Sequence, residues 1–76
     1  ERPVNMWMKN TQLSLDMLFI NQQGVIVKIV RNTIPYSESI IDSGVPVSGV
    51  LELLAGTANE YHIRAGDRVI HKHFEP

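Results

Sequence analysis

The apolar residues of this chain fall in short runs separated by turn residues, and no run has the spacing of a long amphipathic helix. The runs that predict strands span residues 4–8, 13–20, 25–31, 47–54 and 68–74, with Gly, Pro, Asn or Asp between them. Strands joined by turns favour an antiparallel arrangement over a parallel α/β sheet. The pattern therefore predicts a mainly β fold, a small β-sandwich or barrel-like domain with one short helical turn.

The length of 76 residues allows one β-rich domain, residues 1–76, with a small core. A chain of this size buries only about 60% of the surface that its unfolded form exposes. The sequence starts almost directly in a strand-like run and ends without a tail. We therefore expect that part of the native domain is missing.

The runs 13–20 and 25–31 predict a hairpin. If Asn21 pairs with Val25, Gly24 takes the left-handed position that a three-residue loop with a bulge requires. Asp16 and Lys28 then lie diagonally on the mixed face, within reach of each other. The other face in this register carries Leu13, Leu15, Met17, Phe19, Val25, Val27 and Ile29.

The remaining segments predict loops and one turn of helix. Residues 33–46 contain two prolines, a glycine and several serines, which indicates an irregular connection of the kind that often carries function. Thr57 and Glu60 fit a capping box, so a short helical turn is expected there. Asp67 follows Gly66 and is expected to be a turn residue.

The segment Lys9, Asn10 and Thr11 lies between two predicted strands, upstream of Asp16. Asn and Thr side chains commonly bond nearby backbone amides, so a turn is one interpretation. The alternative is a shallow binding site in which Lys9 attracts an anion and Asn10 orients it. A half-buried Asp16 needs partners, and we expect either Lys28 or the backbone amides of residues 9–11. The alternative role for Asp16 is a general base or a ligand of a hard metal ion.

Glu52 offers a second carboxylate, because it lies between two leucines in the run 47–54. Alternation groups Glu52 with Ser48, Val50 and Leu54, and leaves Val47, Gly49, Leu51 and Leu53 for the core face. If this strand lies beside Asp16, then Asp16, Glu52 and Lys9 form a convergent polar cluster. Such a cluster would suit a hydrolase or a lyase with two carboxylates of different proton affinity.

His71 and His73 would point to one face of the last predicted strand and are weak candidates for metal ligands. A metal site would also need His62 or a carboxylate, so surface histidines are the default interpretation. The chain has no cysteine, which excludes thiolate metal sites and Cys nucleophiles. It also has no phosphate-binding glycine loop, nucleophile elbow or HExxH motif, and we expect no cofactor. Trp7 is expected to pack in the core or on a sheet.

The net charge of −1 gives little electrostatic attraction to phosphates, so nucleic acid is not an expected partner. No apolar run approaches the roughly 20 residues that span a bilayer. The residues themselves leave the cellular compartment open.

The segments "WMKNT" (7–11) and "LDMLFI" (15–20), followed by "VLELLAGTA" (50–58) and "AGD" (65–67), resemble in order and spacing the signature of a bacterial and archaeal family, domain of unknown function 192. The resemblance covers nearly the whole chain and implies a compact, mostly β fold without an established activity. Members often follow a signal peptide or a lipoprotein anchor, so the resemblance is consistent with an exported protein. Members usually begin with an earlier segment that this chain lacks, and its loss would leave an edge strand unpaired.

Three functional hypotheses follow. The first is a non-enzymatic module that binds a small ligand or a protein, with residues 9–16 and the loop 33–46 around the site. The second is a hydrolase- or lyase-type enzyme that uses Asp16 and Glu52. The third is an assembly domain that forms a homodimer through an exposed edge strand.

Overall fold

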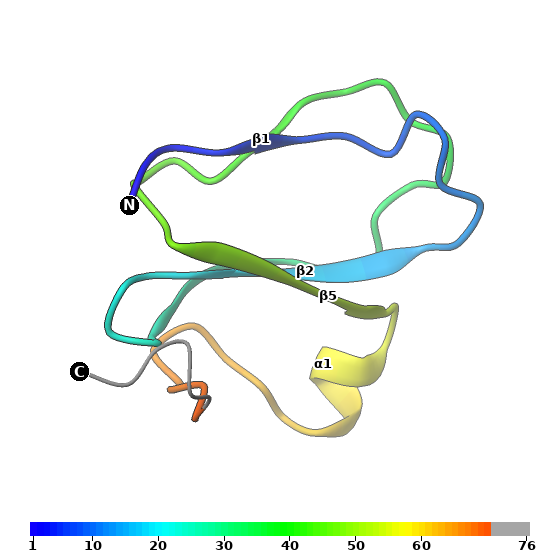
Figure 1. Cartoon of the computed structure of the whole chain (residues 1–76). Coiled ribbons are helices and arrows are strands. Elements are labelled where there is room, and N and C mark those ends of the chain that lie inside the picture. Colours follow the sequence, from blue (N-terminus) through cyan, green and yellow to red (C-terminus); the bar gives the residue numbers. More distant parts are fainter. Residues whose placement is uncertain (71–76) are drawn as a thin grey trace.

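A computed structural model describes residues 1–70 of the chain (Figure 1). The elements in this part are β1 (Asn5–Met6), β2 (Leu15–Ile20), β3 (Ile26–Val30), β4 (Ile41–Asp42), β5 (Gly49–Leu54) and the short helix α1 (Thr57–Glu60). They form two antiparallel sheets, one of order β3-β2-β5 and one of β1 and β4. The predicted mainly β fold with a short helical turn is confirmed. β4 was not predicted, because it is a two-residue strand inside the segment expected to be irregular.

The turn between β2 and β3 has the predicted three-residue loop. The Asn21 amide donates to the Val25 carbonyl at 2.9 Å, and Gly24 has a left-handed φ of 81°. Glycine takes this conformation without the steric cost that a Cβ would bring. The loop therefore fixes where β3 begins.

β2 and β3 do not keep the predicted register, because a β-bulge interrupts their pairing beside Phe19. Val27 is the extra residue, so Phe19 pairs with Lys28. The bulge moves Lys28 to the face of Phe19 and away from the face of Asp16. The predicted contact of Asp16 with Lys28 is therefore wrong, and the Lys28 ammonium donates instead to a backbone carbonyl of β4.

The central strand β2 is buried from Asp16 to Ile20. β1 lies on one side of its sheet and α1 on the other (Figure 1). On one face, here called the β1 face, Met17 and Phe19 pack with Met8 and Val47 beneath β1 and β4. The predicted place of Val47 beside Leu51 is wrong, because Val47 precedes β5 and packs on the β1 face. This face forms the larger core.

The other face of the sheet, here called the α1 face, carries Asp16, Leu18 and Ile20. Leu18 and Ile20 pack with Ile26, and Ile63 and Val69 of the segment after α1 pack against this cluster. α1 lies on the same side of the sheet as this segment (Figure 1). Sequence alternation indicated a mixed face here, but the structure buries every β2 residue from Asp16 onward.

The segment 66–69 runs along the start of β3. The Ile26 amide donates to the Asp67 carbonyl at 2.8 Å, and the Val69 amide donates to the Gly24 carbonyl at 2.7 Å. Within residues 1–70, the predicted last strand contributes a bridge between Val25 and Arg68.

Among residues 1–70, the helix is too short to cross a membrane.

Candidate functional site

Asp16 is the most fully buried charged residue of the described chain, with 1% of its surface exposed. Its Oδ1 accepts from the Asn32 amide at 3.0 Å, and its Oδ2 accepts from the amides of Gly56 at 3.1 Å and Ala58 at 2.9 Å. Backbone amides were expected as partners, but those of residues 9–11 are not the ones found. The carboxylate instead joins the end of β3 to the connection between β5 and α1.

The same carboxylate caps α1. The N-cap residue is Gly56, which has a φ of 94° and no side chain with which to bond the first amides of the helix. No side-chain capping bond comes from the helix itself, so the predicted capping box of Thr57 and Glu60 is wrong. Asp16 accepts from Ala58, the second helical residue, which is the bond that a local N-cap side chain would make. In this structure Asp16 stabilises the fold by linking β2 to the end of β3 and to the start of α1.

Glu52 does not approach Asp16, although β5 lies beside β2. Asp16 pairs with Leu53, and Glu52 pairs with Met17, so the two carboxylates lie on opposite faces of the sheet. Glu52 is exposed on the β1 face. The structure therefore does not bring Asp16, Glu52 and Lys9 into one polar cluster.

Lys9 and Asn10 are exposed and lie in a turn that the Thr11 amide closes by donating to the Met8 carbonyl at 3.0 Å. The Lys9 ammonium lies 5.3 Å from the centre of the Trp7 ring, a cation–π arrangement. The Trp7 side chain is 50% exposed, so it does not lie in the core, which was one of its two predicted places. The turn keeps its structural interpretation, with a cation held over an exposed aromatic ring.

The loop 33–46 contacts this turn. The Tyr36 amide donates to the Thr11 carbonyl at 3.0 Å, and the Thr33 hydroxyl accepts from the Leu15 amide at 2.9 Å. A shallow hollow of about 280 Å³ lies along the loop and includes Met8, Asn32 and several hydroxyl residues. The Thr33 hydroxyl accepts a hydrogen bond from the Leu15 amide, and the Ser37 hydroxyl accepts one from the Ser39 amide. Both hydroxyls therefore stabilise the conformation of the loop.

The remaining polar candidates lie apart from this region. Asp67 is a turn residue, as predicted, because its carboxylate accepts from the Arg64 amide at 2.8 Å. His71 and His73 lie outside the described residues, and His62 is exposed. Within residues 1–70, no three His, Asp or Glu side chains gather as metal ligands would.

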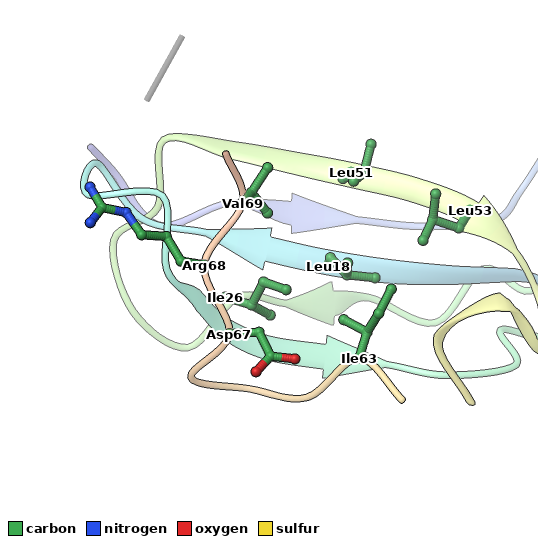
Figure 2. Close-up of a pocket in the computed structure, with 8 residues that line it drawn as sticks. All are labelled: Leu18, Ile26, Leu51, Leu53, Ile63, Asp67, Arg68 and Val69. Carbon is green, nitrogen blue, oxygen red and sulfur yellow. The ribbon is translucent and has the colours of Figure 1, made fainter. Parts of the chain in front are cut away.

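A larger groove of about 380 Å³ lies on the α1 face, between β5 and the segment 63–69 (Figure 2). Figure 2 shows Asp67 at its edge, and Arg68 extending away from the apolar side chains. The apolar residues that line this groove, here called the leucine groove, are Leu18, Ile26, Leu51, Leu53, Ile63 and Val69.

The leucine groove was not predicted from the sequence. The alternation of side chains along residues 47–54 placed Leu51 and Leu53 on one face of that strand. This pattern is the sequence signal for one wall of the groove. Ile63 and Val69 come from a segment whose path over the sheet depends on hydrogen bonds to residues 24 and 26. Leu51 is 41% exposed in the groove.

Comparisons with solved structures found two similar chains of bacterial origin. A crystal structure from Sinorhizobium meliloti 1021, described as a proposed transcription regulator, is 58% identical with a TM-score of 0.87, and the match covers 88% of this chain and 52% of that one. A protein of unknown function from Novosphingobium aromaticivorans DSM 12444 is 32% identical with a TM-score of 0.84, and the match covers 87% of this chain and 47% of that one. The chain thus spans about half the length of each.

A search of curated proteins found no significant match. A family model, DUF192, described as an uncharacterized ACR, matches residues 1–71. That family has no established activity, in agreement with the absence of an assigned function for the Novosphingobium relative. Because the model covers nearly the whole sequence, including all the motifs quoted above, the chain belongs to the DUF192 family.

Proposed function

We propose that this domain is a binding module that holds a small, largely apolar ligand in the leucine groove. The observation that carries the proposal is the composition of the groove, in which apolar side chains from four separate segments surround an open space of about 380 Å³. This size falls in the range of about 300–1,000 Å³ typical of ligand sites.

The setting of the groove supports this role. Its floor is Leu18 of the rigid central strand, and its wall is the segment that carries Ile63 and Val69. Arg31 anchors that segment, since its guanidinium donates to the Ile63 carbonyl at 2.8 Å and to the Asn59 side chain at 3.0 Å. A groove with fixed walls loses little conformational entropy when a ligand binds.

The enzyme hypothesis receives less support from this geometry. A hydrolase that uses two carboxylates needs both carboxyl groups to reach one bond of the substrate, with a separation of at most about 9.5 Å. Asp16 is buried beneath α1, and its carboxylate accepts hydrogen bonds from three backbone amides, whereas Glu52 lies on the other face of the sheet. The binding role for Lys9, Asn10 and Thr11 stays a prediction, with the exposed Lys9 as its cation.

The test is a titration with two amphiphiles that share a ten-carbon chain, decanoate and decyltrimethylammonium. At about 0.3 kcal/mol per heavy atom, a probe of about 12 heavy atoms binds with about 4 kcal/mol, a Kd near 1 mM. Such weak binding is best followed by NMR chemical shifts. Because the apolar chain supplies the binding energy, we expect both probes to bind with similar Kd, and glucose to cause no shift.

The matched variants are Val69→Asp and Val45→Asp. Val69 lines the groove, whereas Val45 is 45% exposed in the turn after β4 and lies outside it. We expect Val69→Asp to raise the Kd of both probes at least about tenfold, a loss of about 1.4 kcal/mol, and Val45→Asp to leave it unchanged. Equal effects of the two variants, or no binding by the folded wild-type chain, would contradict the proposal.

A further inference from the structure

The segment 59–65 runs from α1 to the turn at Gly66 and carries Ile63, which lines the leucine groove (Figure 2). Backbone amides fix both ends of this segment. The Ala58 amide donates to the Asp16 carboxylate at 2.9 Å, and the Gly66 amide donates to a carbonyl of β3 at 2.7 Å. Between these ends every residue is exposed except Ile63, which packs against the buried cluster of the α1 face. The place of Ile63 therefore depends on the conformation of the exposed residues beside it.

His62, which precedes Ile63, has a left-handed backbone with a φ of 56°. It follows Tyr61, the C-cap of α1, and the Ile63 amide donates back to the Ala58 carbonyl at 2.8 Å. Glycine is the usual residue at this position after a helix, because a Cβ there comes close to the next carbonyl oxygen. The histidine is therefore strained, and its side chain is exposed. Such strain persists where the surrounding structure holds the residue in place.

Arg31 is placed to hold this turn. Its Nε donates to the Asn59 side-chain oxygen at 3.0 Å, and its Nη2 donates to the Ile63 carbonyl at 2.8 Å. The two acceptors lie on either side of His62 in the sequence. Because the donors of a guanidinium form a rigid planar fork, the two bonds fix the spacing of their acceptors. One side chain thus spans the strained residue.

We infer that Arg31 is a positioning residue of the leucine groove, which keeps His62 left-handed and thereby keeps Ile63 in the groove. Without the guanidinium, His62 relaxes out of the left-handed region and Ile63 leaves the groove. The segment 59–65 then has two positions, and Arg31 selects the one that completes the groove. The effect on ligand affinity rests on the proposed function, whereas the two positions are a property of the chain without a ligand.

The first test is a cycle of melting temperatures measured without a ligand. Glycine adopts a left-handed conformation without strain. We expect His62→Gly to raise the melting temperature of the wild-type chain by about 4–8 °C. In Arg31→Met we expect less than half of this gain, because the relaxed segment has already lost the strain. Equal gains in the two backgrounds would overturn the inference, since they would show that the segment keeps one position.

The matched control is Tyr36→Gly, because Tyr36 is also left-handed, with a φ of 61°, and lies in the loop 33–46. Effects of distant, independent sites on stability add. We therefore expect Tyr36→Gly to change the melting temperature equally in the wild-type chain and in Arg31→Met. If its effect also shrinks in Arg31→Met, general destabilisation explains both results and the inference is overturned. Arg31→Lys keeps the cation without the fork of donors and replaces Arg31→Met if that variant does not fold.

The second test is the affinity for decanoate and decyltrimethylammonium. We expect Arg31→Met to raise the Kd of both probes about fivefold, because the groove loses the apolar contact of Ile63. Adding His62→Gly to Arg31→Met should bring both Kd values back to within about twofold of the wild type, since glycine keeps the turn without the guanidinium. Arg2→Met removes an exposed arginine elsewhere and should leave both values unchanged. A double variant that binds as weakly as Arg31→Met, or an Arg31→Met that binds like the wild type, would overturn the inference.

The two tests separate this inference from the proposed function. If neither probe binds the folded wild-type chain, the proposed function fails, and the melting temperatures alone decide whether the segment 59–65 has two positions. If the probes bind and the gains from His62→Gly are equal in both backgrounds, the inference fails and the proposed function stands.

Discussion

Asp16 shows why a residue can be identified from the sequence while its partners cannot. A carboxylate between apolar residues of a strand needs hydrogen bonds, and this requirement can be predicted. Its donors, Asn32, Gly56 and Ala58, lie 16, 40 and 42 positions away. The local sequence contains no signal for contacts that depend on the order of the strands. The backbone amides of the nearby turn at residues 9–11 were therefore wrongly predicted as partners of Asp16.

Replacing the Asp16 carboxylate should destabilise the fold. Asp16→Asn puts an amide nitrogen where a carboxylate oxygen accepts, and an unsatisfied buried group costs about 1–3 kcal/mol. We expect urea denaturation to show a loss in this range, or an unfolded chain. Glu52→Gln, the exposed control, should change stability by less than about 0.5 kcal/mol. Equal stabilities of the two variants would show that the carboxylate has no structural role and would return Asp16 to the candidates for a binding site.

At the scale of elements, turns were predicted better than registers. Gly24 and the spacing of apolar residues identified the β2–β3 hairpin, because a position with a left-handed backbone can be recognised in the sequence as a glycine. The bulge at Val27 has no such sequence signal, and it moves Lys28 to the other face of the sheet. The helical turn at α1 was also predicted, but its cap comes from β2 and not from its own first residues.

The entry into α1 should depend on the conformation of Gly56. Its φ of 94° disfavours any residue with a Cβ, and a Cβ placed there would contact no other atom within 4 Å. We therefore expect Gly56→Ala to lower the free energy of unfolding by about 1–2 kcal/mol through backbone strain alone. Gly56→Asn should cost less, since asparagine tolerates left-handed conformations better. A larger loss with asparagine, measured by thermal unfolding, would point to crowding in place of strain.

At the scale of the whole molecule, the two apolar clusters on opposite faces of β2 explain why alternation was a poor guide to the site. A strand buried on both faces carries a nearly continuous apolar run, and LDMLFI is such a run. The leucine groove lies where the cover of one face is incomplete. That incompleteness depends on the path of residues 63–69, which no periodicity in the sequence specifies.

The net charge of −1 predicts that this chain does not bind duplex DNA. This prediction matters because the relative from Sinorhizobium meliloti is described as a proposed transcription regulator. Non-specific DNA binding depends on neutralising phosphates with basic side chains, with Kd of about 10⁻⁴ to 10⁻⁶ M. We expect fluorescence anisotropy with duplex DNA at about 50 mM salt to show no binding of this chain in that range. Micromolar binding that weakens steeply with added salt would be the contrary result.

The measurement that tests the leucine groove most directly is a methyl NMR map of the wild-type chain with decanoate. We predict shifts at Leu18, Leu51, Leu53, Ile63 and Val69, with the methyl signals of Val4 and Val47 on the β1 face unchanged. Shifts confined to the β1 face or to the hollow along residues 33–39, or none at all, would contradict it.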